Sequence, residues 1–166
     1  NPIVARGFLI DVAGAKGVTN LEAGYEITMA DVRDALAKQG QADVKFLPGD
    51  GIFFRTGWGV HWIKDNAKFN SGEPGIGMEV AKWLSDTVQA GVVGSDTWGL
   101  ENVPAKDAGC AFCVHAHLLT RHGIVNQENM DLDALATDKA WRFLYLYSPM
   151  PIVGATGSAG SPVAVK

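Results

Sequence analysis

Residues 110–129, CAFCVHAHLLTRHGIVNQEN, hold three of the four histidines, both cysteines and a Glu-Asn pair. No other stretch concentrates potential ligands in this way. Imidazole nitrogen and carboxylate oxygen together suit zinc, manganese or iron, because both are good donors to divalent cations of this class. The candidate metal ligands are His115, His117 and Glu128. Histidines two residues apart lie on different faces of a helix but on one face of a strand, so we expect only one of them at any given site.

The cysteines allow a second metal interpretation. Cys110 and Cys113 are spaced as CxxC, with His115 and His117 directly after them, which would suit a Cys-His zinc module. No second CxxC or HxxxH pair occurs, and Val114 breaks the CxxCH pattern of haem attachment. We therefore expect two buried free thiols near the start of a helix. A packing or capping role is the alternative for the histidines.

The elements around these candidates follow from the apolar pattern. Residues 115–122 carry two adjacent leucines and end at Gly123, which predicts a short helix. An extended step at 124–125 follows, so Glu128 is expected at or just beyond the end of a strand. A helix that returns into a strand brings together two ligands that are thirteen residues apart.

The rest of the chain alternates strand and helix patterns. Apolar residues that recur every three or four positions predict helices, and continuous apolar runs between turn-forming residues predict buried strands. Thr28 to Asp31 resembles a capping box. Strands are predicted at 8–12, 52–55, 91–95 and 141–147, and helices at 28–38, 77–90 and 131–136. The alternation predicts an α/β fold in a single domain, residues 1–166.

Three further side chains are candidate substrate contacts. Trp58 follows a predicted strand and lies close in sequence to His61 and Trp62. Aromatic groups at a strand exit often line a pocket for a flat ligand, and a small satellite core is the alternative. Asp96 and Trp98 follow the next buried strand at its carboxyl end, where mixed sheets usually place their site residues. For Asp96 the alternative is a plain loop cap.

Composition limits the possible partners. The chain has 166 residues, of which 47% are hydrophobic, and this is enough for one real core. A net charge of −4, a pI near 5.5 and the lack of any Lys/Arg run argue against nucleic acid. No apolar stretch reaches the roughly 18 residues that span a bilayer. We expect a soluble protein. Its compartment is undetermined, since no targeting segment is recognisable. The first residues, from Asn1, resemble the middle of a domain rather than its start.

Several segments occur together in a family-like order. The pattern His115-x-x-Leu-Leu, Gly-Ile, Glu128-Asn129 and then Asp-Leu-Asp-x-Leu at 131–135 resembles the C-terminal signature of the cyclase family, which includes bacterial kynurenine formamidases and isatin hydrolase. Other similar segments are LIDV at 9–12, FFRTGWG at 53–59, GVVGSDTWGLE at 91–101 and GATGSAGSPVAV at 154–165. Together they cover almost the whole chain, so the set is specific although each piece is weak alone.

The resemblance implies a mixed β-sheet with flanking helices in the swivelling β/β/α arrangement, assembled as dimers or tetramers. It also implies hydrolysis of a small cyclic or formylated amide or lactone with a divalent metal, Mn or Zn. In the family most ligands come from an N-terminal motif, His-x-Gly-Thr-His-x-Asp-x-Pro-x-His, and a later His and Glu complete the set. Carried over, these two fall on His115 and Glu128. The family's commonest His–Glu spacing is one residue shorter, so His117 remains a candidate.

The N-terminal motif has no counterpart among these residues, so two hypotheses follow. In the first, the chain is the C-terminal two thirds of a metal hydrolase whose remaining part is cleaved, disordered, not included or on another chain. In the second, it is a metal-free relative that acts as a binding or structural subunit. Retention of His115, Glu128 and Asn129 favours the first. The tryptophans suit a planar small-molecule substrate, which the sequence does not identify further.

Overall fold

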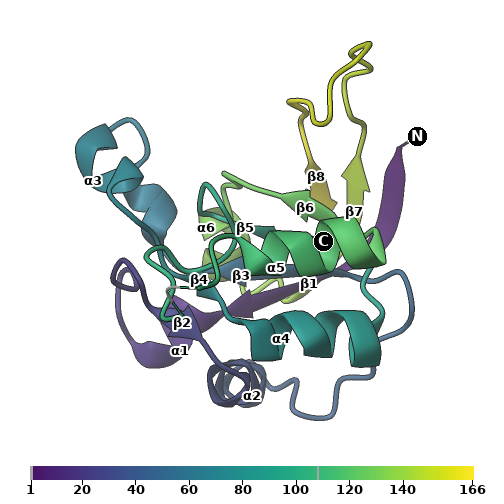
Figure 1. Ribbon diagram of the computed structural model, residues 1–166. Helices are drawn as coiled ribbons and strands as arrows, with labels where there is room; N and C mark the ends of the chain where they lie inside the picture. Colours follow the sequence, from purple (N-terminus) through teal and green to yellow (C-terminus); the bar gives the residue numbers. More distant parts are fainter. Residues whose placement is uncertain (1, 108) are drawn as a thin grey trace.

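The computed structural model describes residues 2–107 and 109–166 and contains a six-stranded mixed sheet (Figure 1). The strand order is β6-β5-β3-β1-β7-β8, in which the first four are parallel to one another and the last two join antiparallel. The strands are β1 (Ile3–Asp11), β3 (Gly51–Arg55), β5 (Val92–Ser95), β6 (Val125–Gln127), β7 (Arg142–Tyr147) and β8 (Val163–Val165). This confirms the mixed α/β prediction. A second, two-stranded sheet pairs β2 (Glu26–Ile27) with β4 (Gly75–Ile76).

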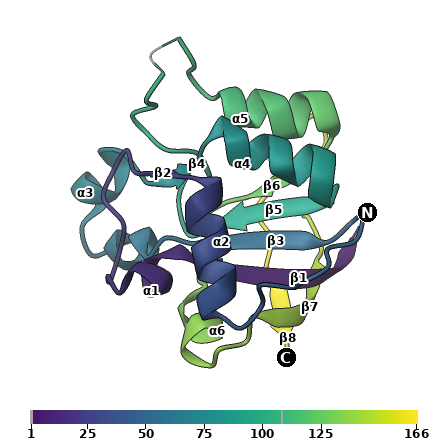
Figure 2. The same cartoon turned by 90° about the horizontal axis from the view of Figure 1, so that it is seen from below.

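Helices cover one face of the sheet, where Figure 2 shows α2, α4 and α5 side by side. Two of them continue without a break as π-helical segments, named η2 and η3. The helices on this face are α2 (Met29–Lys38), α4 (Met78–Lys82) with η2 (Trp83–Val88), and α5 (Cys113–His115) with η3 (Ala116–Arg121). The shorter ones are α1 (Val12–Lys16), η1 (Trp58–His61), α3 (Asn66–Asn70) and α6 (Asp133–Thr137).

The central strands are buried on both faces. Along β3, Ile52 and Phe54 pack under the helices, while Phe53 packs on the opposite face with Tyr145 of β7. Successive side chains of a strand point to opposite faces, so a strand covered on both sides reads as a continuous apolar run. This rigid centre fixes the positions of the loops that leave the strands.

Several boundaries differ from the sequence predictions, and the helix predicted at 115–122 spans Cys113–Arg121. β1 begins at Ile3 rather than residue 8, because residues 3–8 pair antiparallel with β7. The predicted 77–90 helix ends at Val88, and Gln89 adopts a left-handed conformation. The helix predicted from residue 131 begins at Asp133, and Leu132 is its N-cap residue. The predicted capping box is present, with Thr28 and Asp31 bonded reciprocally at the start of α2.

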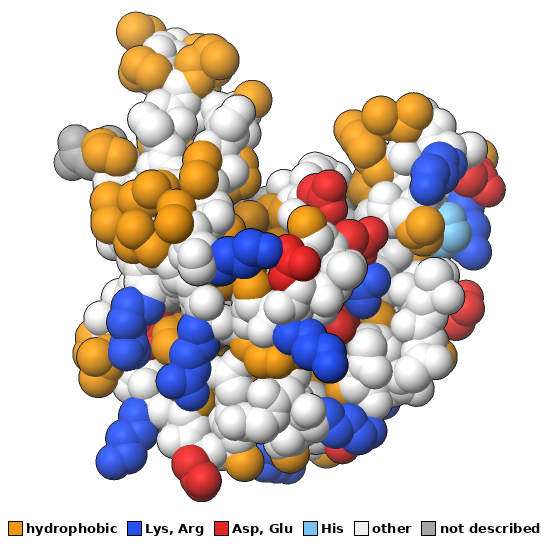
Figure 3. Space-filling view, turned by 180° about the vertical axis from the view of Figure 1, so that it is seen from behind, with side chains coloured by type: hydrophobic (Ala, Val, Ile, Leu, Met, Phe, Trp, Pro, Cys, Tyr) orange, Lys and Arg blue, Asp and Glu red, His pale blue; other side chains and the backbone are white. Residues whose placement is uncertain are grey.

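The β7–β8 hairpin extends from the body as an arm, and apolar side chains cover much of its surface (Figure 3). Exposed apolar residues on it include Met150, Ile152 and Val153. The same view shows a hollow between this arm and the lobe that contains α3. Among the described residues, no helix combines the length and the apolar character that a membrane crossing requires.

Candidate metal and substrate site

The candidate site lies where the parallel strands end. The carboxyl ends of β3, β5 and β6 lie at one edge of the sheet, which is the usual place for ligands in such sheets. The loop after β6 is fixed there because the backbone N–H of Asn129 donates to the carbonyl of Thr97 over 2.8 Å. This contact places Glu128 beside the segment that follows β5.

His115 lies at the end of α5 and is held on both sides of its ring. Its Nδ1 is 2.7 Å from Glu101 Oε1, and its Nε2 is 2.9 Å from Glu128 Oε1. Glu101 is buried and also accepts hydrogen bonds from the backbone N–H groups of Val114 and His115. The Glu101 carboxylate therefore caps the first turn of the helix and also orients the His115 ring.

The two carboxylates give His115 an unusual charge state. Hydrogen bonding to Glu101 and then to Glu128 raises the pKa of His115 to about 9, against an ordinary value of 6.5. The ring is therefore a cation at neutral pH in the metal-free chain. The structure thus places a positive charge between the two carboxylates.

Glu73 is a third acid of this cluster and is fully buried. Its Oε2 accepts a hydrogen bond from the backbone N–H of Trp98 over 2.6 Å, while Oε1 has no hydrogen-bond partner among the described residues. Burial is the main cause that raises the pKa of Glu73 to about 8, and the nearby charge of Glu128 adds to it. The carboxyl group is consequently protonated near neutral pH.

These residues fit part of a divalent metal site. Two donors about 2.1 Å from one ion and about 90° apart would be separated by about 3 Å. The 2.9 Å between His115 Nε2 and Glu128 Oε1 meets that requirement. Metal-binding histidines commonly have a carboxylate on the second ring nitrogen, and Glu101 occupies that position on Nδ1 of His115. The pair supplies two donors, so a tightly held ion needs further ligands.

Asp96 lies under the same edge. It is buried, and its carboxylate accepts from the N–H and hydroxyl of Thr56 and from the N–H of Gly57, over 2.6 to 2.9 Å. Burial raises its pKa despite these donors. Asp96 thereby ties the exit of β3 to the exit of β5.

A pocket of about 210 Å³ lies beside Asp96 and the loop after Glu128. Its lining is Gly59, Val60, Trp62, Lys64, Phe69, Asp96 and residues 129–133. Of the three predicted substrate contacts, Asp96 lines this pocket, whereas Trp58 and Trp98 do not.

The tryptophans differ in their access to this pocket. Trp62 is exposed and lines it. Trp58, a predicted substrate contact, is 1% exposed and its indole N–H donates to the carbonyl of Phe69, so it supports the pocket from the core. Trp98 donates to the same carbonyl over 3.0 Å and packs against Phe112. Trp98 thus lies between the pocket and the His115 cluster.

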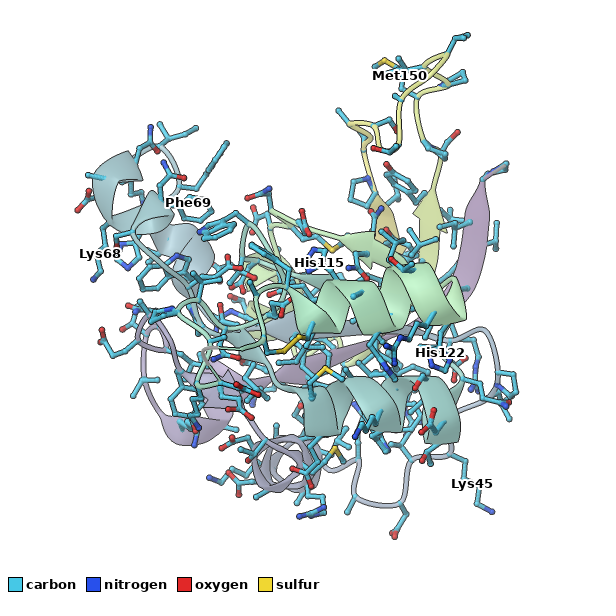
Figure 4. The ribbon with its side chains drawn as sticks, in the orientation of Figure 1. Lys45, Lys68, Phe69, His115, His122 and Met150 are labelled. Carbon is cyan, nitrogen blue, oxygen red and sulfur yellow. A yellow bond between two sulfur atoms is a disulfide. The ribbon has the colours of Figure 1, made fainter. Side chains whose placement is uncertain are left out.

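His117 points away from this cluster. Its Nε2 is 2.9 Å from the hydroxyl of Ser85 in η2, and its ring lies 4.5 Å from the ring of His122. In Figure 4, His122 lies in the seam between the two helices, whereas His115 lies at the other end of its helix. The structure brings together His115 and Glu128 of the three predicted ligands, and leaves His117 apart.

The prediction of two buried free thiols is wrong. Cys110 and Cys113 form a disulfide and are partly exposed. Their Cα atoms are 5.4 Å apart, within the usual range for a disulfide, because Phe112 between them adopts a left-handed conformation and turns the chain. The oxidised pair offers no thiolate for a Cys-His zinc module.

Sequence analysis did not identify Glu73 or Glu101 as site residues. Glu73 follows Ser-Gly, and Glu101 follows Trp-Gly-Leu, within glycine-rich segments that read as loops. A single acid among small and apolar residues is a signal of a buried carboxylate. The same pattern is common in surface turns, so it does not distinguish Glu73 and Glu101 from other acids of the chain.

The sequence profile of the family described as Putative cyclase matches residues 1–102. No curated protein matches the chain. A crystal structure of a novel cyclase is 35% identical, with a TM-score of 0.82 over 97% of this chain and 53% of that one.

Two isatin hydrolase structures are similar in fold. Isatin hydrolase A from Ralstonia solanacearum is 20% identical, with a TM-score of 0.74 over 99% of this chain and 61% of that one. An isatin hydrolase bound to the product analogue thioisatinate is also 20% identical, with a TM-score of 0.76 over 98% and 60%. The chain therefore spans between one half and two thirds of the length of the structures it matches.

Proposed function

Because the chain belongs to the cyclase family, we propose that it forms part of a metal-dependent hydrolase of a small cyclic or formylated amide or lactone. The observation that carries the proposal is the His115–Glu128 pair, 2.9 Å apart, with Glu101 fixed behind the ring. This arrangement supports the proposal because it could supply two adjacent metal ligands and a carboxylate that orients the ring. The pocket next to it provides space for a small organic substrate.

His115 Nε2 and Glu128 are the proposed ligands from this chain, and manganese or zinc is the proposed ion. A bound divalent ion of this kind lowers the pKa of water and stabilises negative charge that develops on an acyl oxygen. The ion would replace the proton that His115 now holds between the carboxylates. Metal binding and protonation of His115 therefore compete, and metal affinity is expected to rise with pH until His115 is neutral.

Glu73 contributes to the charge balance of the proposed site. Its neutral carboxyl group avoids a further negative charge beside Glu128 while no ion is bound. A nearby cation favours the ionised form, so metal binding is expected to release a proton from Glu73. The fully buried position of Glu73 argues for this electrostatic role and against contact with substrate.

The pocket supports a flat substrate. Trp62 and Phe69 meet edge to face with their ring centroids 5.2 Å apart and both line the pocket, while Asp96 and Asn129 are polar lining residues. A planar ring suits such aromatic walls. The similar isatin hydrolase structure contains the product analogue thioisatinate, and this small ligand supports the proposal of a small organic substrate. We propose a small substrate with a planar ring.

The remaining ligands are proposed to come from outside these residues, from contiguous polypeptide or from a partner subunit. Two donors do not hold an ion tightly, and the matching structures are considerably longer than this chain. The exposed apolar residues of the β7–β8 arm are compatible with such a neighbour, and a homo-oligomer is the form we propose.

The test is elemental analysis of the protein from its native source together with its intact mass. We expect about one manganese or zinc per protomer, a mass above 17.6 kDa, and hydrolysis of some member of an amide and lactone panel. Glu128→Gln is expected to lose the metal, whereas the control Glu22→Gln, at an exposed acid far along the chain, keeps it. A metal-free protein of 17.6 kDa would instead support the alternative, a binding or structural subunit without catalysis.

A further inference from the structure

A second group of potential metal ligands lies between η2 and the α5–η3 helix. Asp86 of η2, His117 of η3 and His122, the C-cap residue of η3, each place one ligand atom so that all three atoms lie within 4.8 Å of one another. His122 is seven residues beyond His115, about 10 Å farther along the helix. This group is therefore separate from the His115–Glu128 pair.

The group is already linked by hydrogen bonds. The Ser85 hydroxyl lies 2.9 Å from His117 Nε2 and 2.7 Å from Asp86 Oδ1. Ser85 and His117 are both largely buried, which limits the movement of the imidazole. Asp86 and His122 are exposed, so their side chains can turn toward a common point. One fixed donor and two adjustable ones is a workable starting arrangement for a metal site.

The donor types indicate the ion. Two imidazoles and a carboxylate favour zinc and neighbouring first-row ions over magnesium or calcium, which prefer oxygen ligands alone. Bonds of about 2.1 Å require ligand atoms about 3.4 Å apart in a tetrahedral site. The present spacing needs an inward movement of about 1 Å, which the two exposed side chains can supply by small rotations.

We propose that Asp86, His117 and His122 bind a second divalent ion of the zinc class. The ion would join η2 to η3 and so clamp two neighbouring helices on the sheet face (Figure 4). The second helix carries His115 at its other end, so the clamp would also restrain the element that positions the first site. The proposal does not depend on the hydrolase function.

The test is zinc titration by isothermal calorimetry, without reductant so that the Cys110–Cys113 disulfide stays intact. The starting protein carries Glu128→Gln, which removes the proposed first site. We expect about one zinc per chain with a dissociation constant on the order of micromolar. Adding His122→Asn or Asp86→Asn should weaken binding by about tenfold or more.

Two matched controls separate this site from scattered surface binding. His61→Asn and Asp43→Asn change the same residue types elsewhere and should leave the dissociation constant unchanged. Zinc should also raise the melting temperature of the starting protein, and His122→Asn should abolish that rise. The proposal is overturned if the starting protein binds no zinc at micromolar concentrations, or if binding survives both His122→Asn and Asp86→Asn.

Discussion

His115 and His117 are two residues apart on one helix, yet they lie in opposite chemical environments. His115 lies between two carboxylates, and its pKa is raised to about 9. His117 lies against η2, where burial and then the neighbouring His122 lower its pKa. The difference shows that the elements facing a helix, rather than the spacing along it, determine what each histidine can do.

The two regions also differ in how they are built. The His115 region uses acids from three separate segments: Glu101 follows β5, Glu128 follows β6, and Glu73 precedes β4 and pairs with Val103. The His117 region uses residues from two adjacent helices. Long-range convergence is typical of a catalytic site, whereas a local cluster between helices is suited to a structural ion.

The largest expected difference between the two histidines concerns catalysis. With the most active substrate of the amide and lactone panel, His115→Gln should lower kcat/KM by about 100-fold or more, because a ligand is lost. His117→Gln should change it by less than about threefold. Circular dichroism checks that both variants fold. Equal losses in the two variants would show that the helix as a whole, and not His115, supports the reaction.

Removal of Glu101 should cause the largest loss of stability. Glu101→Ala leaves two buried backbone N–H groups and the His115 ring without their acceptor, and we expect a loss of about 3 kcal/mol in urea unfolding of the metal-free chain. Glu128→Ala, at a more exposed acid, should cost about 1 kcal/mol or less. If Glu101→Ala lowered the free energy of unfolding as little as Glu128→Ala, the role of Glu101 in capping the helix would be contradicted.

The stability of the metal-free chain should depend on pH with opposite sign through His115 and through His117. Since the folded pKa of His115 is above 6.5, its stabilisation is fully present below pH 6.5 and is lost as the pH rises through about 9. Glu73 acts in the same direction, because its raised pKa lowers stability as the pH rises from 4.5 to about 8. The pKa of His117 is lowered, so its contribution increases as the pH rises toward 6.5.

Urea unfolding between pH 5 and 10 in the presence of a chelator measures the pH dependence of the free energy of unfolding. We expect this free energy to fall by about 1–2 kcal/mol between pH 6.5 and 9. His115→Gln should flatten the upper part of that fall, and Glu73→Gln the lower part. His117→Gln should change the profile only below pH 6.5. A profile that is flat above pH 6.5 in the unaltered chain would contradict the carboxylate environment of His115.

The smallest expected effect is at the exposed end of the second region. Without metal, His122→Asn should change the free energy of unfolding by less than about 0.5 kcal/mol, because the side chain is exposed. A larger loss in the presence of a chelator would mean that His122 stabilises the helix by packing. In that case the zinc-dependent difference would have to be measured against this background.

The sequence was informative where a local pattern has one physical solution. The capping box at Thr28 and Asp31, the buried runs of β3 and β5, and the helix from 115 that returns into a strand all follow from short-range rules. The same rules correctly predicted that His115 and His117 would point to different places. The approach of His115 to Glu128 followed from that helix-to-strand step.

Features that depend on distant contacts were not predictable. Nothing within a few residues of Glu101 shows that it caps a helix thirteen residues later. The burial of Trp58 depends on the carbonyl of Phe69, eleven residues away. The disulfide needed a left-handed Phe112, which residue type does not predict. In each case the determining partner lies in another element of the fold.

The central claim is that His115 and Glu128 bind one ion together, and anomalous diffraction tests it most directly. Crystals of the native protein grown with manganese would be measured on both sides of the manganese absorption edge. The account predicts an anomalous peak within about 2.3 Å of both His115 Nε2 and a Glu128 carboxylate oxygen. A fully occupied manganese peak elsewhere, with His115 still hydrogen-bonded to both Glu101 and Glu128, would contradict it.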